Sequence, residues 1–429
     1  MDRAALLIAD QPRVVRYARG VEYELLLACA RTHIDTALAQ EIRALLQREI
    51  DWRFFGQLAS DHQVAPLVGH TLCTHFSAAC PAHIVEQFRT LLQRNTSHNL
   101  FLAHALTSAL ALFSAHRVRA IAYKGPILAA STYGNLGLRS FADLDLLVHP
   151  WDYHFRVAEL LLARGWSQVA DYGFERTFKD ASRRVRLDVH QSLTPKRSMP
   201  FALDFDRAWR RGVDVPLSGA TVKTFAPSDL LLVLCVQIAK DMGDDGKAAP
   251  LIKICDVAEW VRAHPQVDWN KLLRYAARLG ALRMVLLGLA VAQRLLGAKL
   301  PPEIAQRMCD EAALATLVDH VEECVLGTGP QGHSRPELLQ RARWHGEVRE
   351  RVRERDRWQR ALFYFAFAPN RYDYEFVRLP RVLRGLYCVV RPLRLAYKYG
   401  SGLVARKRRS TYVGPGTRDK EPVPPVPSK

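Results

Sequence analysis

The spacing of hydrophobic positions divides the chain into helical and strand-like parts. Over the first 115 residues, apolar side chains recur at three- and four-residue intervals, which is typical of amphipathic helices packed on a core. Four helices are predicted in this part, over 23–30, 36–48, 52–73 and 83–116. We therefore expect a helical amino-terminal region covering residues 1–115.

From residue 117 onwards, short β-like runs replace this pattern. Strands are predicted over 118–123, 144–148, 174–178 and 185–190, with one helix over 152–164. The short segment 179–183 joins the last two strands, which predicts a β-hairpin. Residues 116–225 are therefore expected to form a small mixed sheet with helices on one side.

Helical periodicity returns after Pro227, where Ser228 is a suitable N-cap. We expect a helical domain over 226–330 that packs on the sheet, then a basic, aromatic helical region over 331–412. Residues 413–429 are rich in Pro and Gly, which predicts a disordered tail. The expected fold class is α+β, with a small mixed sheet between amino-terminal and carboxy-terminal helical regions.

Composition narrows the class of protein. With 429 residues, of which 49% are hydrophobic, the chain is long enough for two or three domains. No early stretch resembles a signal peptide, and the most apolar later stretch, 230–239, is far shorter than the ~18 residues that cross a membrane. We expect a cytoplasmic protein.

The eight cysteines form no Cys-x-x-Cys pair, which favours free thiols over disulfides or zinc ligands.

The net charge of +18 favours polyanionic partners: nucleotides, nucleic acid or an anionic membrane surface. Much of this charge lies in the last third of the chain, including the runs 349–360 and 406–409. A solvated helix face and a disordered tail explain these runs as well as a binding role does. The basic aromatic segment 386–399 also suits a helix in peripheral contact with a membrane.

Three aspartates carry the strongest indication of chemistry. Asp143 and Asp145 are separated by one Leu in a predicted strand, and Asp188 lies between Arg186 and His190 at the same spacing in another. Because alternate residues of a strand share a face, the three carboxylates are expected to converge. Clustered carboxylates repel one another unless a hard cation such as Mg²⁺ neutralises them. The pattern points to phosphoryl or nucleotidyl transfer, and polar positions on two half-exposed strands are the plain alternative.

A second signal lies upstream, where a predicted strand ends at Lys124 and Gly125 and Pro126 suits the first turn of a helix. Free backbone N–H groups at a helix start bind phosphates, glycine permits close approach, and Lys124 adds a positive charge. Taken alone, such a segment is also typical of an ordinary turn.

These motifs follow one another along the chain. The set comprises Lys124-Gly125, Tyr133, Arg139, Asp143, Asp145, Asp188 and His190, with Asp51-Trp52, Asp256 and the segments 280–283 and 391–394 in support. In this arrangement the chain resembles the uncharacterised nucleotidyltransferase family of bacteria, a branch of the DNA-polymerase-beta-like nucleotidyltransferase superfamily. The likeness extends over most of the chain.

The resemblance implies that Asp143, Asp145 and Asp188 bind two Mg²⁺ ions and that a nucleoside triphosphate is the substrate. The implied reaction is in-line displacement at the α-phosphorus with two-metal catalysis. One departure from the superfamily concerns its Gly-Ser or Gly-Gly turn, which here is Lys124-Gly125 without a hydroxyl.

Three more side chains are candidates for the site. Arg139 is expected to neutralise charge on the transferred phosphate, unless it only pairs with one of the aspartates. His190 is either a metal ligand or general base, or a hydrogen-bonded residue that holds Asp188 in place. Lys124 is expected to take the place of the missing serine at the phosphates. Lys240 either contacts a phosphate or is solvated.

Three functions stay open on this evidence. The leading hypothesis is a nucleotidyltransferase that acts on a small molecule, peptide, glycan or protein. Transfer to nucleic acid is the alternative motivated by the charge, and it predicts steeply salt-dependent binding. A catalytically silent module at an anionic surface is the third, and the retention of all three acids argues against it.

Overall fold

The computed structural model describes residues 20–194, 201, 203–244, 250–326, 344, 346–349, 377 and 386–394. Contacts divide the chain into two units, Met1–Trp358 and Gln359–Lys429. Most of the two basic runs and the whole of the tail 413–429 lie outside the described residues, so the expectations for them stay predictions.

The described part of the amino-terminal region is helical, as its periodicity predicts. Its helices are α2 (Val21–Cys29), α3 (Thr36–Leu46), α4 (Trp52–Asp61), α5 (Ala65–His75) and the long α6 (Ala82–Ala115), with a short 3-10 helix η1 (Ser77–Ala79). The single helix expected over 52–73 is two helices, because the chain turns at Gln63, whose φ of 58° is left-handed.

The middle of the chain forms a five-stranded mixed sheet, and the α+β fold class is confirmed. Its strands are β1 (Ala120–Ala122), β2 (Leu144–Val148), β3 (Ser167–Asp171), β4 (Glu175–Lys179) and β5 (Arg186–His190), in the order β1-β2-β5-β4-β3. Strands β2 and β5 are parallel, whereas the other neighbouring pairs are antiparallel. The predicted hairpin is present as β4 and β5. Strand β3 was missed because its largely polar sequence lacks strand alternation.

Short helices connect these strands. They are α7 (Gly125–Ser131), the 3-10 helix η2 (Leu136–Leu138), α8 (Pro150–Phe155) and α9 (Val157–Ala163). The helix expected over 152–164 is divided at Arg156, whose φ of −131° is not helical. After the sheet come α10 (Phe205–Arg211) and a separate hairpin of β6 (Val213–Leu217) and β7 (Ala220–Thr224), neither of which was predicted.

Helices resume as expected after this hairpin. They are α11 (Pro227–Asp244), α12 (Leu251–Ala263), α13 (Trp269–Leu279), α14 (Leu282–Leu296), α15 (Pro302–Cys309) and α16 (Leu314–Val325). Helix α11 begins at Pro227, two residues before the start that an N-cap at Ser228 predicts, so Ser228 lies in its first turn, where its hydroxyl accepts a hydrogen bond from Arg211. In the part of the chain that the structure describes, no helix is long and apolar enough to cross a membrane. All eight cysteines are free, as expected.

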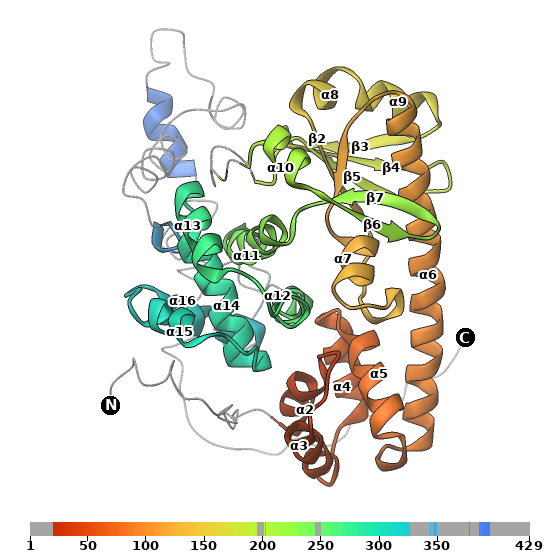
Figure 1. Ribbon diagram of the computed structural model, residues 1–429, viewed down its shortest axis with the longest axis vertical. Helices are drawn as coiled ribbons and strands as arrows, with labels where there is room; N and C mark the ends of the chain where they lie inside the picture. The colour runs from red at the N-terminus through yellow and green to blue at the C-terminus, as the bar shows by residue number, and fades with distance from the viewer. Residues whose placement is uncertain are drawn as a thin grey trace, which may run out of the picture. The chain divides into compact units, whose positions relative to one another are not determined.

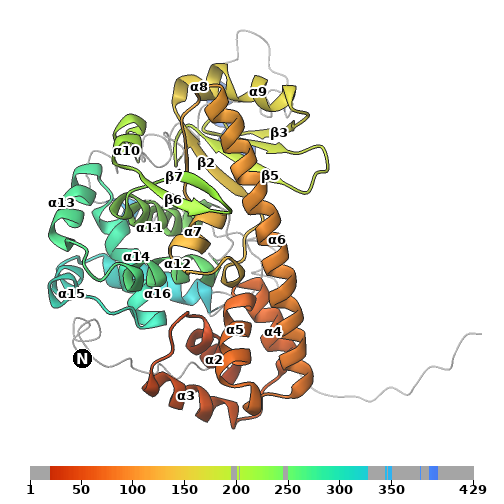
Figure 2. The same cartoon turned by 45° about the vertical axis from the view of Figure 1, so that its right-hand side comes forward.

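Two hydrophobic clusters lie on opposite faces of the sheet. Leu144 and Leu187 pack into a cluster with the second half of α6 and with α9. Ile121 and Leu147 face the other way, into a cluster that includes α11, α12 and the amino-terminal helices. Figures 1 and 2 show α6 on one side of the sheet and α11 and α12 on the other. Helices α2 to α5 therefore contribute to the same hydrophobic cluster as α11, α12 and α14.

Candidate active site

Strand pairing places two of the predicted acids side by side. Asp145 and Asp188 are register partners in the parallel pair β2 and β5, so their backbones lie ~4.8 Å apart and their side chains leave the same face of the sheet. Because Leu144 and Leu187 pack against α6 and α9, the acids face the opposite layer. Both acids are buried. The common face expected from the alternation is present for this pair.

Asp143 lies immediately before β2 rather than within it, since the strand begins at Leu144. Burial, together with the negative charges of Asp145 and Asp188, raises the pKa of Asp143 above its ordinary value, and Lys124 opposes this shift. Asp143 is therefore electrostatically coupled to the other two acids, although it does not share their strand geometry.

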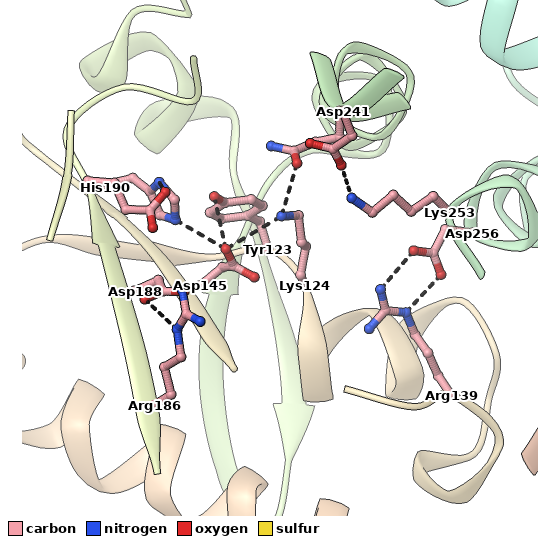
Figure 3. A network of polar contacts seen from close by, with 12 residues as sticks. Tyr123, Lys124, Arg139, Asp145, Arg186, Asp188, His190, Asp241, Lys253 and Asp256 are labelled. Carbon is pink, nitrogen blue, oxygen red and sulfur yellow. Dashed lines mark hydrogen bonds and ion pairs between the residues drawn. The ribbon is translucent and has the colours of Figure 1, made fainter. Parts of the chain in front are cut away.

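Asp145 is the centre of a network of polar contacts (Figure 3). Its Oδ1 accepts hydrogen bonds from the Tyr123 hydroxyl at 3.4 Å and from the His190 Nε2–H at 3.1 Å, and it lies 3.5 Å from Lys124 Nζ. Burial disfavours the charged carboxylate, but Lys124 and His190 outweigh it and hold the pKa of Asp145 below its ordinary value. Asp145 is therefore ionised at neutral pH, with its charge matched by Lys124.

His190 supports a different acid from the one expected. It contacts Asp145 on the neighbouring strand, not Asp188 on its own strand, and its Nδ1 lies 3.6 Å from Glu175 Oε2. Glu175 is opposite His190 in the β4–β5 hairpin. Sequence reasoning missed Glu175, because pairing the two predicted hairpin strands outward from their turn places it opposite Asp188, two residues out of the observed register.

Asp188 is held by Arg186, two residues earlier on the same strand. The guanidinium donates from Nε to Oδ1 at 3.1 Å, and its Nη2 lies 2.9 Å from Oδ2, so it contacts both carboxylate oxygens. Burial opposes the charge of Arg186, but Asp188, Asp143 and Glu175 raise its pKa. The Arg186 side chain is 45% exposed, whereas that of Asp188 is 5% exposed. Arg186 is thus a partly exposed counter-ion of the buried Asp188 carboxylate.

These pairings decide how the acids relate to a metal ion. Among the described residues, no three His, Cys, Asp or Glu side chains are gathered closely enough to hold one. Carboxylate oxygens are the ligands that hard divalent cations prefer, so the three acids fit Mg²⁺ in their chemistry. Their arrangement, however, is that of carboxylates neutralised by Lys124 and Arg186. Shared metal binding therefore stays a prediction.

The turn at Lys124 and Gly125 has a structural explanation. Gly125 has a left-handed φ of 52°, and a Cβ there would lie 3.1 Å from the carbonyl oxygen of Asp143. The backbone of this turn thus packs against the segment that carries Asp143, which accounts for the glycine without a phosphate. The side chain of Lys124 nevertheless reaches the site, since its Nζ contacts both Asp145 and, at 3.3 Å, Gln237 Oε1 of α11.

Replacement of Gly125 by Ala is therefore expected to lower the free energy of unfolding by about 1–2 kcal/mol, because the left-handed backbone penalises a Cβ. Urea unfolding without nucleotide measures this loss. Gly134→Ala is the comparison, since the φ of Gly134, 69°, is also left-handed but its Cβ position is open, so this variant should show the backbone penalty without the close contact to Asp143. Unchanged stability for Gly125→Ala, with weaker nucleotide binding, would restore the phosphate interpretation.

Arg139 pairs with Asp256, which is not one of the three acids of the predicted site. Its Nε and Nη2 donate to the two carboxylate oxygens of Asp256, each at 2.8 Å, and the Tyr133 hydroxyl donates to the same carboxylate at 2.7 Å. All three residues are buried. The pairing alternative therefore describes the structure, with Asp256 of α12 as the partner. In this arrangement Arg139 joins the loop before β2 to the helical layer rather than facing a phosphate.

Two lysines of the helical layer lie near Lys124. Lys240 on α11 has its Nζ 5.5 Å from the centre of the Phe174 ring, and Lys253 on α12 forms an ion pair with Asp241. Burial and the charges of Lys124 and Lys240 lower the pKa of Lys253 to about 8. Sequence reasoning singled out Lys240 but not Lys253, because no local motif marks it.

A small mixed sheet that carries acids on adjacent strands beneath a layer with lysines is consistent with a phosphate-transferring enzyme. A family model described as an uncharacterised nucleotidyltransferase matches residues 48–297. That range is more than half of the chain, and the protein therefore belongs to this family. The match begins before α4 and ends just after α14, so it contains every site residue described above.

Other comparisons add little. A search of the curated proteins finds no match. The solved structure of an antigenic nucleotidyltransferase-like protein from Paracoccidioides brasiliensis is 17% identical and covers 46% of this chain and 93% of its own, with a TM-score of 0.30. A likeness at this level supports no conclusion about the site, and the assignment rests on the family match.

Proposed function

We propose that this protein is a Mg²⁺-dependent nucleotidyltransferase that transfers a nucleoside monophosphate from a nucleoside triphosphate to an acceptor hydroxyl or phosphate. The acceptor would be a small molecule, peptide, glycan or protein. The observation that carries the proposal is the register pairing of Asp145 and Asp188 on adjacent parallel strands, in a chain that belongs to a nucleotidyltransferase family.

In this proposal Asp143, Asp145 and Asp188 hold the metal. A bound divalent cation would supply an electrophile for the phosphoryl oxygens. His190 and Tyr123 hold Oδ1 of Asp145 through hydrogen bonds. These bonds fix the orientation of the carboxylate and therefore the position of its second oxygen. Rigid support of this kind keeps a ligand in position before the substrate arrives.

Lys124 and Lys240 are the proposed phosphate contacts. Lys124 lies between Asp145 and α11, which is a suitable position for neutralising a phosphate beside a metal-bound carboxylate. Lys240 approaches from α11 itself, next to the ring of Phe174. Ammonium groups bind phosphates as point charges and tolerate changes in phosphate geometry during transfer.

The test is incubation with each labelled nucleoside triphosphate and Mg²⁺, followed by measurement of released pyrophosphate and of label in protein and small-molecule fractions. The proposal expects pyrophosphate release from at least one triphosphate by the parent protein and none from Asp145→Asn. Label should appear in an acceptor from a cell extract of the source organism. Equal release by the parent and Asp145→Asn would contradict the proposal.

The pairing of Arg186 with Asp188 gives a prediction about metal binding. A metal that binds Asp188 must displace Arg186, so Arg186→Gln should bind Mn²⁺ more tightly. Because the pair is partly exposed, the expected gain is roughly two- to fivefold in affinity, measured by electron paramagnetic resonance titration without nucleotide. Arg184→Gln, at an exposed position just before β5, is the control and should bind Mn²⁺ like the parent. Equal affinity in all three proteins would show that no exchange takes place.

A further inference from the structure

Lysines from three elements gather on the side of the acids that faces the helical layer. Lys124 occupies the N-cap position of α7, Lys240 lies on α11 and Lys253 lies on α12. The positive charges of Lys124 and Lys240 both act on the ammonium of Lys253. In Figure 3 the side chains of Lys124 and Lys253 extend toward the same helix, α11, from two directions. These lysines form one cluster, which we call the lysine cluster.

Such a cluster is unfavourable in a protein without a ligand. Like charges held together in a partly buried site repel one another, and burial removes the water that would screen them. Two carboxylates offset the cluster in part, since Asp145 lies beside Lys124 and Asp241 pairs with Lys253. The Lys253 side chain is 30% exposed, and burial together with the charges of Lys124 and Lys240 lowers its pKa in spite of these carboxylates.

A purely structural role explains only part of this arrangement. The ion pair of Lys253 with Asp241 joins α12 to α11, and one lysine is sufficient for that purpose. Lys124 pairs with Asp145 and Lys240 lies over the ring of Phe174, and the charges of both also act on Lys253. An anion that carries several charges would explain all three side chains, because each added ammonium strengthens its binding.

We propose that Lys253 completes, with Lys124 and Lys240, a subsite for the polyphosphate chain of a nucleotide. The ligand class is a linear polyphosphate, which a nucleoside triphosphate supplies and a nucleoside monophosphate does not. The inference rests on the proposed function, and it deepens that function by naming a residue on α12 and the part of the substrate it binds. It also replaces the role expected for the Gly125 backbone and for Arg139, both of which have structural partners.

The subsite has a consequence for protons. An anion beside Lys253 favours its charged form, so binding near pH 8 should be accompanied by proton uptake at Lys253. The charged groups that act on Lys253 are Lys124, Lys240, Asp145, Asp241 and Asp256. Proton uptake that requires Lys253 would therefore indicate direct contact between Lys253 and the anion, rather than a general change in the charge of the protein.

The experiment is calorimetric titration of the full chain with inorganic tripolyphosphate at low salt, without a divalent cation. Lys253→Met should raise the dissociation constant at least about tenfold, as loss of one charged hydrogen bond predicts, and Lys253→Arg should keep most of the affinity. Lys271→Met, at an exposed position of α13, is the matched control and should bind like the parent. Titration in two buffers of different ionisation enthalpy near pH 8 should show proton uptake in the parent and less in Lys253→Met.

Asp241→Asn provides an independent variant. It removes the carboxylate that competes for Lys253, so it should bind tripolyphosphate more tightly than the parent. The subsite is wrong if the parent fails to bind tripolyphosphate, or if Lys253→Met binds it as tightly as the parent does. These results do not depend on turnover. A protein that binds tripolyphosphate through Lys253 but releases no pyrophosphate from any nucleotide would retain the subsite and refute the transferase.

Discussion

Replacing Asp145 by Asn is expected to reduce nucleotide transfer by at least about 10³-fold, which corresponds to ~4 kcal/mol of lost transition-state stabilisation. The same change should lower the free energy of unfolding by about 1–3 kcal/mol, because Lys124 and His190 lose the charged partner of their contacts. Pyrophosphate release measures the first effect, and urea unfolding without nucleotide measures the second.

The matched variant is Asp143→Asn, which should lose activity but not stability. The pKa of Asp143 is raised by burial and by Asp145, so its ionised form costs folding free energy, and the neutral amide removes that cost. Mutual repulsion between clustered carboxylates would by itself predict little loss of stability for both variants. The structure separates them, since only Asp145 is paired with a lysine and a histidine.

The contributions of Asp145 and Asp143 to folding stability also depend on pH in opposite directions. The pKa of Asp145 is depressed, so its stabilising contribution is present above the ordinary aspartate pKa and is lost as the pH falls through the depressed value. The pKa of Asp143 is raised, so its cost is complete above that raised value and disappears as the pH falls to the ordinary value. The stability gain of Asp143→Asn should therefore shrink between pH 7 and acidic pH. Equal stability of the two variants at pH 7 would contradict this assignment.

Replacing Arg139 by Met should lower the free energy of unfolding by about 3–5 kcal/mol, because it leaves the buried carboxylate of Asp256 without its charged partner. The ion pair connects residues that lie 117 positions apart, so its loss loosens the sheet from α12. Urea unfolding measures the effect. Arg89→Met is the comparison variant, since both side chains of its pair with Glu86 are exposed, and it should cost less than about 1 kcal/mol.

The double variant Arg139→Met with Asp256→Leu should recover much of this stability, because no charge is then left buried and unpaired. If both stability and transfer activity are recovered, Arg139 supports activity by stabilising the fold rather than by binding a phosphate. If the single variant is as stable as the parent but binds nucleotide poorly, the phosphate role expected from the sequence is correct after all.

Local sequence pattern was enough to determine most of the elements and one relation within the site. Helical periodicity located α3 and α6 to within a few residues and the return of helices after Pro227, and alternation located β2 with its observed bounds. Both signals are local, because the side chains of a helix or strand point in directions set by the backbone alone. For the same reason, alternation placed Asp188 and His190 on a common face, and the hairpin of β4 and β5 followed from two adjacent runs.

The partners of these side chains were decided by the tertiary structure. Arg139 is joined to Asp256 rather than to a phosphate or a site acid, and Lys253, which no sequence motif marks, reaches the site from α12. Strand order brought Asp145 beside Asp188 and His190 beside Glu175, and the close packing of one turn required Gly125. Each of these relations links residues far apart in the chain or depends on three-dimensional packing. The free energy of such contacts depends on burial and on the other charges nearby, which local periodicity does not encode.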